Sequence, residues 1–473
     1  MLTPLISSEE PPVETITYIL KNIKKILVHY KFLTDSYVLD FFTCSHWNKL
    51  PPAWRLFFSN VTSKDLHMLL NFSAGSSHHV VPLEIICLRN LINYLSIPRD
   101  YVNNSKTNTY TLGKPDQSKK IEKLFWKHIK RKKQHEIRSF AHVIFETASA
   151  TKCPYIVDVG SGLGHLDRLL AFGYGFRVCG IECNEKLTTQ ARCLDGLFTK
   201  RVKTYDQHFL QTNQPPIHIN CSISPSTSVA EFLQVVKEAF AEDVPFGIVG
   251  LHPCGDLAPT LLRLYRKCAK IKFINVVGCC YMKLTTESDS ASNSSYGYPL
   301  SRFALENQFH LSYNAREVAC HALESYVARL KSNECWRLRI HCYRAVLEYL
   351  IAREYPEYHH SALANVKYQP EMTFSEYCGK ALKCLRIKLS EESVNSEAVN
   401  VFLSEWRAVL AFYSIRLLFA PLIESTILLD RYLYLYENTD GNCSLVTAFD
   451  PLVSPRNHIL MGRKGERSIE TAQ

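Results

Sequence analysis

A glycine-rich turn directly after a short apolar run is the part of this sequence best suited to hold a small ligand. Residues 158–164 read Asp-Val-Gly-Ser-Gly-Leu-Gly. Glycines at such a turn let the backbone approach a ligand where any Cβ would collide, and a helix beginning just after the turn offers free N–H groups. Glu182 follows the next apolar run, at the distance expected of a carboxylate that accepts hydrogen bonds from two ribose hydroxyls. This pattern predicts a nucleoside site.

Two nucleoside ligands fit such a turn. A dinucleotide is typically bound by G-x-G-x-x-G, whereas this chain has the tighter G-x-G-x-G, preceded by Asp158. The tighter form favours S-adenosyl-L-methionine, with Asp158 facing its ammonium group. Lys133 and His135 precede the first strand and could fold over the cofactor's carboxylate, or they could belong to a solvated basic helix. The predicted cofactor-binding residues are Asp158, Gly160, Ser161, Gly162, Gly164, Glu182, Lys133 and His135.

Candidate catalytic side chains follow two later apolar runs. In parallel sheets, ligands bind beyond the carboxyl ends of the strands, which gathers residues 252–256 and 279–283 beside the glycine turn. We predict that His252 is a general base oriented by Asp256, and that Tyr281 positions the acceptor. Asp256 could instead cap a helix that begins near Leu257.

The elements that must position these residues alternate between strand and helix patterns. Strands are predicted at 155–159, 176–181, 246–251 and 273–278, with a weaker one at 201–205, and helical spacing separates them. A hairpin is predicted from 445–449 and 458–461. The pattern indicates an α/β, doubly wound parallel sheet with an N-terminal helical region and a large helical insertion before the last two strands. The expected segments are 1–113 (helical), 114–310 (sheet core), 311–440 (insertion), 441–465 (hairpin) and 466–473 (tail).

Composition excludes a disordered or fibrous protein, since 46% of the 473 residues are hydrophobic and 21% are charged. The 17 cysteines form no CxxC pair, so we expect free thiols and no metal site. Residues 1–10 are polar and show no signal peptide, which favours an intracellular protein, cytoplasmic or nuclear.

Two segments suggest partners. Between Lys114 and Arg138 there are ten basic and three acidic residues, which fits either RNA contact or a solvated helix face. Ala408–Leu429 is apolar and long enough to cross a membrane. It contains Arg416 and Glu424, however, and it precedes strands that must rejoin the sheet. We therefore expect a buried helix and no membrane span.

Several motifs together resemble the methyltransferase-like protein 25 family. They include 157–166 (VDVGSGLGHL), 250–257 (GLHPCGDL), 277–284 (VGCCYMKL) and 420–431 (APLIESTILLDR), and the resemblance extends from about residue 30 to 463. It implies a seven-strand, class I (Rossmann-like), S-adenosylmethionine-dependent methyltransferase. The resemblance does not identify the acceptor, which we expect to be RNA or protein. Residues 252–256 lack the N-L/I-P-Y/F motif of adenine-N6 dimethylases, which argues against adenine dimethylation. The alternative function is a catalytically silent scaffold that binds partners through its helical regions.

Overall fold

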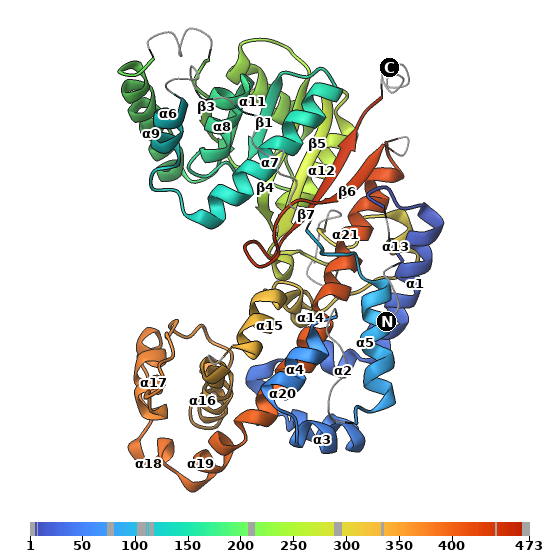
Figure 1. Ribbon diagram of the computed structural model, residues 1–473, viewed down its shortest axis with the longest axis vertical. Helices are drawn as coiled ribbons and strands as arrows, with labels where there is room; N and C mark the ends of the chain where they lie inside the picture. The colour runs from blue at the N-terminus through green and yellow to red at the C-terminus, as the bar shows by residue number, and fades with distance from the viewer. Residues whose placement is uncertain are drawn as a thin grey trace. The chain divides into compact units, whose positions relative to one another are not determined.

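A seven-stranded sheet organises the part of the chain that carries the glycine turn (Figure 1). In the computed structural model the strand order is β3-β2-β1-β4-β5-β7-β6. Strands β1 to β5 are parallel, and β7 is antiparallel to both β5 and β6. The predicted doubly wound sheet of seven strands, ending in a hairpin, is confirmed. The strands are β1 Tyr155–Val159, β2 Arg177–Glu182, β3 Ile217–Asn220, β4 Phe246–Cys254, β5 Ile271–Cys279, β6 Cys443–Thr447 and β7 His458–Arg463.

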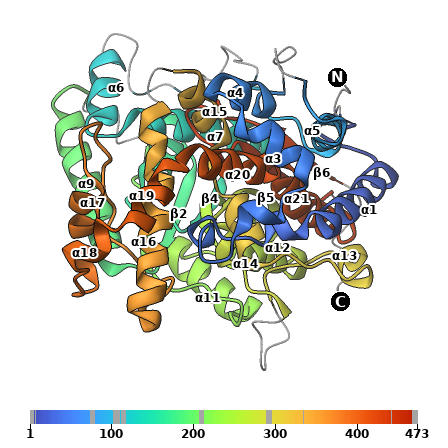
Figure 2. The same cartoon turned by 90° about the horizontal axis from the view of Figure 1, so that it is seen from below.

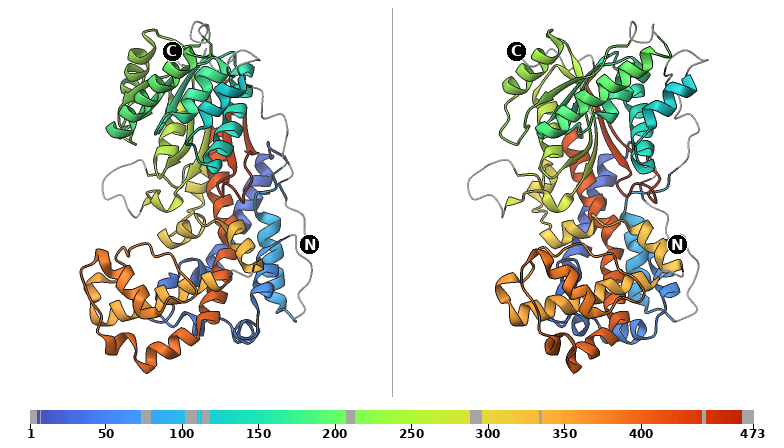
Figure 3. Two further views of the ribbon diagram at one scale, coloured as in Figure 1. Left: turned by 60° about the vertical axis from the view of Figure 1, so that its left-hand side comes forward. Right: turned by 90° about the vertical axis from the view of Figure 1, so that its left-hand side faces the viewer.

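Helices cover both faces of this sheet (Figure 3). Val249 and Leu251 of β4 belong to one apolar core shared with the helices from α6 to α9. A Cβ on the intervening Gly250 would instead lie 3.2 Å from Leu261 of α12, so α12 packs on the opposite face. The helices are α6 Ser118–Trp126, α7 Arg131–Ala150, α8 His165–Tyr174, α9 Glu185–Lys203, α11 Val229–Phe240, α12 Leu257–Lys267 and α13 Arg302–Glu306, with the short 3₁₀ helix η4 Tyr281–Lys283.

The chain divides into two units. The sheet unit comprises Ile6–Leu20, Pro98–Leu311 and Ser425–Gln473, and the other comprises Met1–Leu5, Lys21–Ile97 and Ser312–Glu424. The structure describes residues 5–6, 8–72, 80–101, 110, 112, 118–206, 213–287, 296–332, 335–439 and 442–465. The predicted tail, 466–473, and the start of the basic segment at Lys114 lie outside these residues.

The second unit contains helices and, among its described residues, no strand (Figure 2). It therefore joins two segments that the sequence analysis treats separately, the N-terminal region and the insertion. Its helices are α2 Lys31–Thr34, α3 Pro52–Ser59, α4 Ser63–Leu70, α5 Leu83–Leu95, α14 Tyr313–Val318, α15 Leu323–Lys331, α16 Ile340–Glu354, α17 Phe374–Ala381, α18 Glu391–Val394, α19 Glu397–Ser404 and α20 Trp406–Leu418. Two of the five unit boundaries fall inside helices, α1 Val13–His29 and α21 Ala420–Tyr436.

The apolar segment near the C-terminus forms the continuous helical stretch Trp406–Tyr436. Its length and composition would suit a membrane span, but its most apolar window is entirely buried within the protein. Arg416 on this stretch pairs with Glu317 (3.6 Å) and donates to the carbonyl of Asn314 (3.2 Å). These contacts are those of a core helix, as the sequence analysis predicts.

Candidate functional site

A cavity of about 360 Å³ lies over the glycine turn, within the range of about 300–1,000 Å³ common for small-molecule sites. Its walls come from the carboxyl ends of β1 and β4, the turn itself, the start of α8, and the segment that leads into α7. The lining residues are His128, Ile129, Lys130, Lys133, Asp158, Gly160, Ser161, Gly162, Leu163, His165, Leu166 and Leu251. Five of the predicted cofactor-binding residues are therefore brought together here.

The glycines of the turn have different roles. Gly160, Gly162 and Gly164 all have positive φ, at +82°, +57° and +64°. A Cβ on Gly162 would meet no atom within 4 Å, so the absence of a side chain keeps the cavity open at this point. A Cβ on Gly164 would lie 2.5 Å from His218 Cε1, so this glycine is required for packing, and it does not line the cavity.

Asp158 places a buried carboxylate on the cavity wall. Its Oδ1 has no hydrogen-bond partner among the described residues. Burial raises the pKa of Asp158 to about 6. Burial, together with the charge of Asp158, raises the pKa of neighbouring Asp167 well above its ordinary value. A buried carboxyl with a free oxygen is stabilised by a cationic or hydrogen-bond-donating ligand.

Glu182 lies at the end of β2, as predicted, but its carboxylate hydrogen-bonds to the backbone of the glycine turn. Oε2 accepts the N–H of Gly162 (3.0 Å) and Oε1 accepts the N–H of Asn184 (2.9 Å). Glu182 does not line the cavity. Oε1 also accepts the thiol of Cys183 (3.4 Å), so Oε2 is the oxygen that keeps a second lone pair, and the predicted contact with a ribose remains a prediction.

Of the two candidates on α7, only Lys133 reaches the cavity. The Nε2 atom of His135 accepts the N–H of Asp450 (3.0 Å), and its ring packs edge-on against Phe449 and Tyr101. The prediction that His135 binds cofactor is corrected, because residues two apart on a helix point in different directions.

The predicted base, His252, is oriented by a residue that the sequence analysis did not select. Its Nε2 lies 3.0 Å from Oε1 of Glu136, on α7. Burial acts to raise the pKa of Glu136, but the hydrogen bond and charge of His252, the hydroxyl of Ser454 and the ammonium of Lys133 outweigh it and lower that pKa to about 2. Glu136 is therefore a carboxylate that fixes the imidazole. It follows His135 in the chain, but nothing in the sequence indicates a partner 116 residues away.

The other two catalytic predictions are corrected. Asp256 does not contact His252. Its carboxylate accepts the N–H (2.9 Å) and the hydroxyl (2.7 Å) of Thr285, joining the segments that follow β4 and β5. It occupies the N-cap position of α12 without a side-chain capping bond. Tyr281 is only 1% exposed, and Arg431 and Arg456 lie over its ring, so it cannot meet an acceptor.

Three cysteine thiols meet where β4 and β5 end. Sγ of Cys254 lies 3.2 Å from that of Cys279 and 3.3 Å from that of Cys280, and the latter two are 3.6 Å apart. The hydrogen bond from Cys279 lowers the pKa of Cys254 to about 5. Burial opposes this shift, and a second hydrogen bond from Cys280 adds to it. Burial and the negative charge of Cys254 raise the pKa of Cys280.

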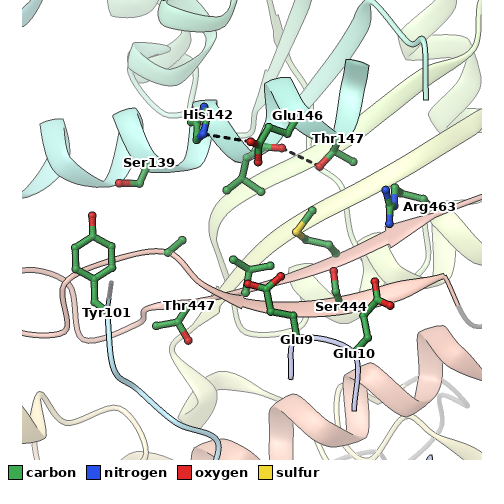
Figure 4. A pocket seen from close by; sticks show the side chains of 14 residues that line it. Glu9, Glu10, Tyr101, Ser139, His142, Glu146, Thr147, Ser444, Thr447 and Arg463 are labelled. Carbon is green, nitrogen blue, oxygen red and sulfur yellow. Dashed lines mark hydrogen bonds and ion pairs between the residues drawn. The ribbon is translucent and has the colours of Figure 1, made fainter. Parts of the chain in front are cut away.

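A second cavity of about 500 Å³ in the sheet unit lies between α7 and the β6–β7 hairpin. Figure 4 shows Glu9, Glu10 and Ser444 on one side, and His142 and Glu146, which pair at 3.4 Å, on the other. Burial and then the charges of Glu10 and Glu146 raise the pKa of Glu9. This cavity includes none of the glycine turn, so it is not the nucleoside site.

Comparison with known proteins defines the class of this domain. A protein-family profile described as a methyltransferase domain matches residues 132–287. This range contains α7, the glycine turn, the Glu136–His252 pair and the three thiols. The strand order and the glycine turn agree with that assignment, so the chain carries a methyltransferase domain of the class I, Rossmann-like type.

The chain is also similar to curated proteins. It is 33% identical over 228 residues to probable methyltransferase-like protein 25 of Mus musculus and 31% identical over 229 residues to that of Homo sapiens. Each match covers 46% of this chain and 37% of the relative's length. Among solved structures, a magnesium protoporphyrin IX methyltransferase from Synechocystis is 12% identical. The match covers 33% of this chain and 64% of that one, with a TM-score of 0.21, which is too low to support any inference.

Proposed function

We propose that this chain is an S-adenosylmethionine-dependent methyltransferase that acts on RNA. The observation that carries the proposal is the cavity over the glycine turn. It contains a buried carboxylate oxygen of Asp158 that has no hydrogen-bond partner in the described part of the chain, and an open space where Gly162 has no Cβ. A ligand that enters this cavity should bring a positive charge or hydrogen-bond donors to Asp158.

The residues present fit this cofactor. Asp158 would bind its ammonium group, and Lys133 is placed to attract its carboxylate. Glu182 fixes the turn through the N–H of Gly162, and its Oε2 keeps a lone pair for a ribose hydroxyl. The cofactor would supply a methyl group already activated by a sulfonium charge, so the protein mainly has to orient the reactants.

His252, oriented by Glu136, would accept the proton that the acceptor loses. Because the Glu136 carboxylate accepts a hydrogen bond from Nε2–H of His252 (3.0 Å), Nδ1 carries the free lone pair of the ring. The imidazole is partly exposed near the carboxyl end of β4, the same edge of the sheet as the glycine turn, and it lies beside Leu251 of the cavity wall without lining the cavity itself. Glu136 is a positioning residue that stabilises the protonated imidazole.

Basic side chains beside the cavity favour a polyanionic acceptor. Three of them, His128, Lys130 and Lys133, line the cavity itself. Such a group neutralises phosphates and makes binding dependent on salt. The exposed basic residues of this segment are Lys119, Lys120, Lys123, Lys127, His128, Lys130, Arg131 and Lys132.

Transfer of a labelled methyl group tests this proposal. The full chain, incubated with radiolabelled S-adenosylmethionine and cell extract, should label material that ribonuclease destroys and protease does not. Gly162→Arg, which fills the cavity, should abolish labelling. Label that is lost to protease and resists ribonuclease would overturn the RNA acceptor. Cofactor binding without any transfer would favour the scaffold.

A further inference from the structure

The three thiols of Cys254, Cys279 and Cys280 form a cluster that the fold assembles from two strands. Cys254 ends β4 and Cys279 ends β5, and the two are direct neighbours in the parallel ladder after an irregularity between Leu251 and Cys254. Cys280 follows with a left-handed backbone (φ +49°). This conformation turns its thiol back to within 3.3 Å of Cys254. Cys254 lies 25 and 26 positions before the adjacent Cys279 and Cys280. The sequence therefore places the two segments at one edge of the sheet but does not single out the three thiols.

The separations of the sulfur atoms match those of metal ligands. Three thiolates about 2.3 Å from a tetrahedral zinc ion lie about 3.8 Å from one another. The three observed separations, 3.2, 3.3 and 3.6 Å, are shorter than this value by about 0.2 to 0.6 Å, so the sulfur atoms need to move apart only slightly to hold the ion. A disulfide would need a separation of about 2.05 Å, and it would leave the third thiol unexplained.

The surroundings hold the thiols in place. Asp256 joins the segments that follow β4 and β5 through two hydrogen bonds to Thr285. A Cβ on Gly255 would lie 2.9 Å from the carbonyl oxygen of Lys283, so the same two segments are in close contact at a second point. Residues that fix the orientation of metal ligands in this way commonly tune metal affinity. This gives Asp256 a role that does not require contact with His252.

The cluster has an open side. Cys254 is exposed and Cys280 is half-buried. Among the described residues, no fourth histidine, cysteine or carboxylate joins the three thiols as a ligand. Three protein ligands and one open position are typical of catalytic zinc sites, whereas structural zinc sites have four protein ligands.

We propose that Cys254, Cys279 and Cys280 bind one Zn²⁺ ion and leave its fourth position open to water or an anionic group. Soft thiolate ligands select Zn²⁺ over hard cations such as Mg²⁺. The site lies at the same edge of the sheet as the glycine turn, because both follow the carboxyl ends of parallel strands. The proposal replaces the expectation from the sequence that the chain has no metal site, and it does not depend on methyl transfer.

Metal content tests the proposal directly. The full chain, treated with a chelator, incubated with an equimolar amount of Zn²⁺ and passed through a desalting column, should retain about one zinc ion per chain by mass spectrometry. Cys254→Ser and Cys279→Ser should retain none, whereas Cys193→Ser, which changes an exposed cysteine on α9, should retain the wild-type amount. Substitution with Co²⁺ should give the intense sulfur-to-cobalt absorption of a tetrahedral thiolate site. This absorption should be lost in the two cluster variants only.

A second measurement needs no variant and so does not depend on the folding of one. Zn²⁺ should protect the three clustered cysteines of the wild-type chain from alkylation, as mapped by peptide mass spectrometry, and leave Cys193 reactive. The proposal is overturned if the wild-type chain retains no zinc, if alkylation of the cluster is equally fast with and without Zn²⁺, or if Cys254 and Cys279 are found as a disulfide in the purified protein.

Discussion

The raised pKa of Asp158 predicts that Asp158→Asn stabilises the protein in the absence of ligand. In the folded chain the charged carboxylate is buried, with Oδ1 lacking a partner, and its pKa rises from 3.8 to about 6. A shift of about 2 pH units corresponds to about 3 kcal/mol, which the folded state loses when Asp158 ionises. Because the pKa of Asp158 is higher in the folded than in the unfolded chain, this loss of folding stability is absent below pH 3.8. It grows between pH 3.8 and 6 and is complete above pH 6. An asparagine amide avoids this cost.

Urea titrations of both proteins between pH 4 and 7.5 measure the effect. The variant should match the wild type near pH 4 and exceed it by up to about 3 kcal/mol at pH 7, while its affinity for S-adenosylmethionine falls. An Asp158→Asn variant that is less stable than the wild type at pH 7, or a difference that does not change with pH, would refute the reasoning.

Two further predictions concern residues that support the site. Gly180→Ala on β2 should reduce both the stability of the protein and its affinity for the cofactor, because the added Cβ would collide with Oδ2 of Asp167 and the hydroxyl of Ser161. Thermal melts measure the first effect and calorimetry the second. A variant equal to the wild type in both would contradict the packing. Glu136→Gln should lower the free energy of unfolding by about 3 kcal/mol at pH 7, because folding lowers the pKa of this buried carboxylate from 4.5 to about 2. The difference in stability from the wild type should shrink as the pH falls below 4.5. Urea titrations at pH 7 and pH 3 check this value, because the cost should fall to less than half at pH 3, and a cost that is the same at both would contradict it.

The sequence predicted those parts of the sheet whose residues are buried on both faces. β1, β2, β4 and β5 are continuous apolar runs, and the β6–β7 hairpin follows the predicted positions closely. β3 at Ile217–Asn220 was missed because it is a short, alternating strand at the edge of the sheet. The weak strand predicted at 201–205 is wrong, since α9 continues to Lys203.

The candidate site was predictable where its residues are neighbours in the chain. The turn at 158–164 and Lys133 line one cavity, because a strand, a turn and a helix must follow one another in space as they do in sequence. The pairing of His252 with Glu136 and the meeting of three cysteines depend on which helix crosses β4 and on an irregularity near its end. Both are tertiary features, and periodicity does not specify them.

The most direct test of the account compares alanine at two glycines by calorimetric titration with S-adenosylmethionine. Gly162 and Gly175 both have positive φ (+57° and +76°), and a Cβ on either would meet no atom within 4 Å, so alanine strains the backbone similarly at the two positions. Only Gly162 lines the cavity. We expect Gly175→Ala to bind S-adenosylmethionine as tightly as the wild type does. Gly162→Ala should bind it at least about tenfold more weakly, a loss of about 1.4 kcal/mol in binding free energy. No binding by the wild type, or equal affinities for the two variants, would contradict it.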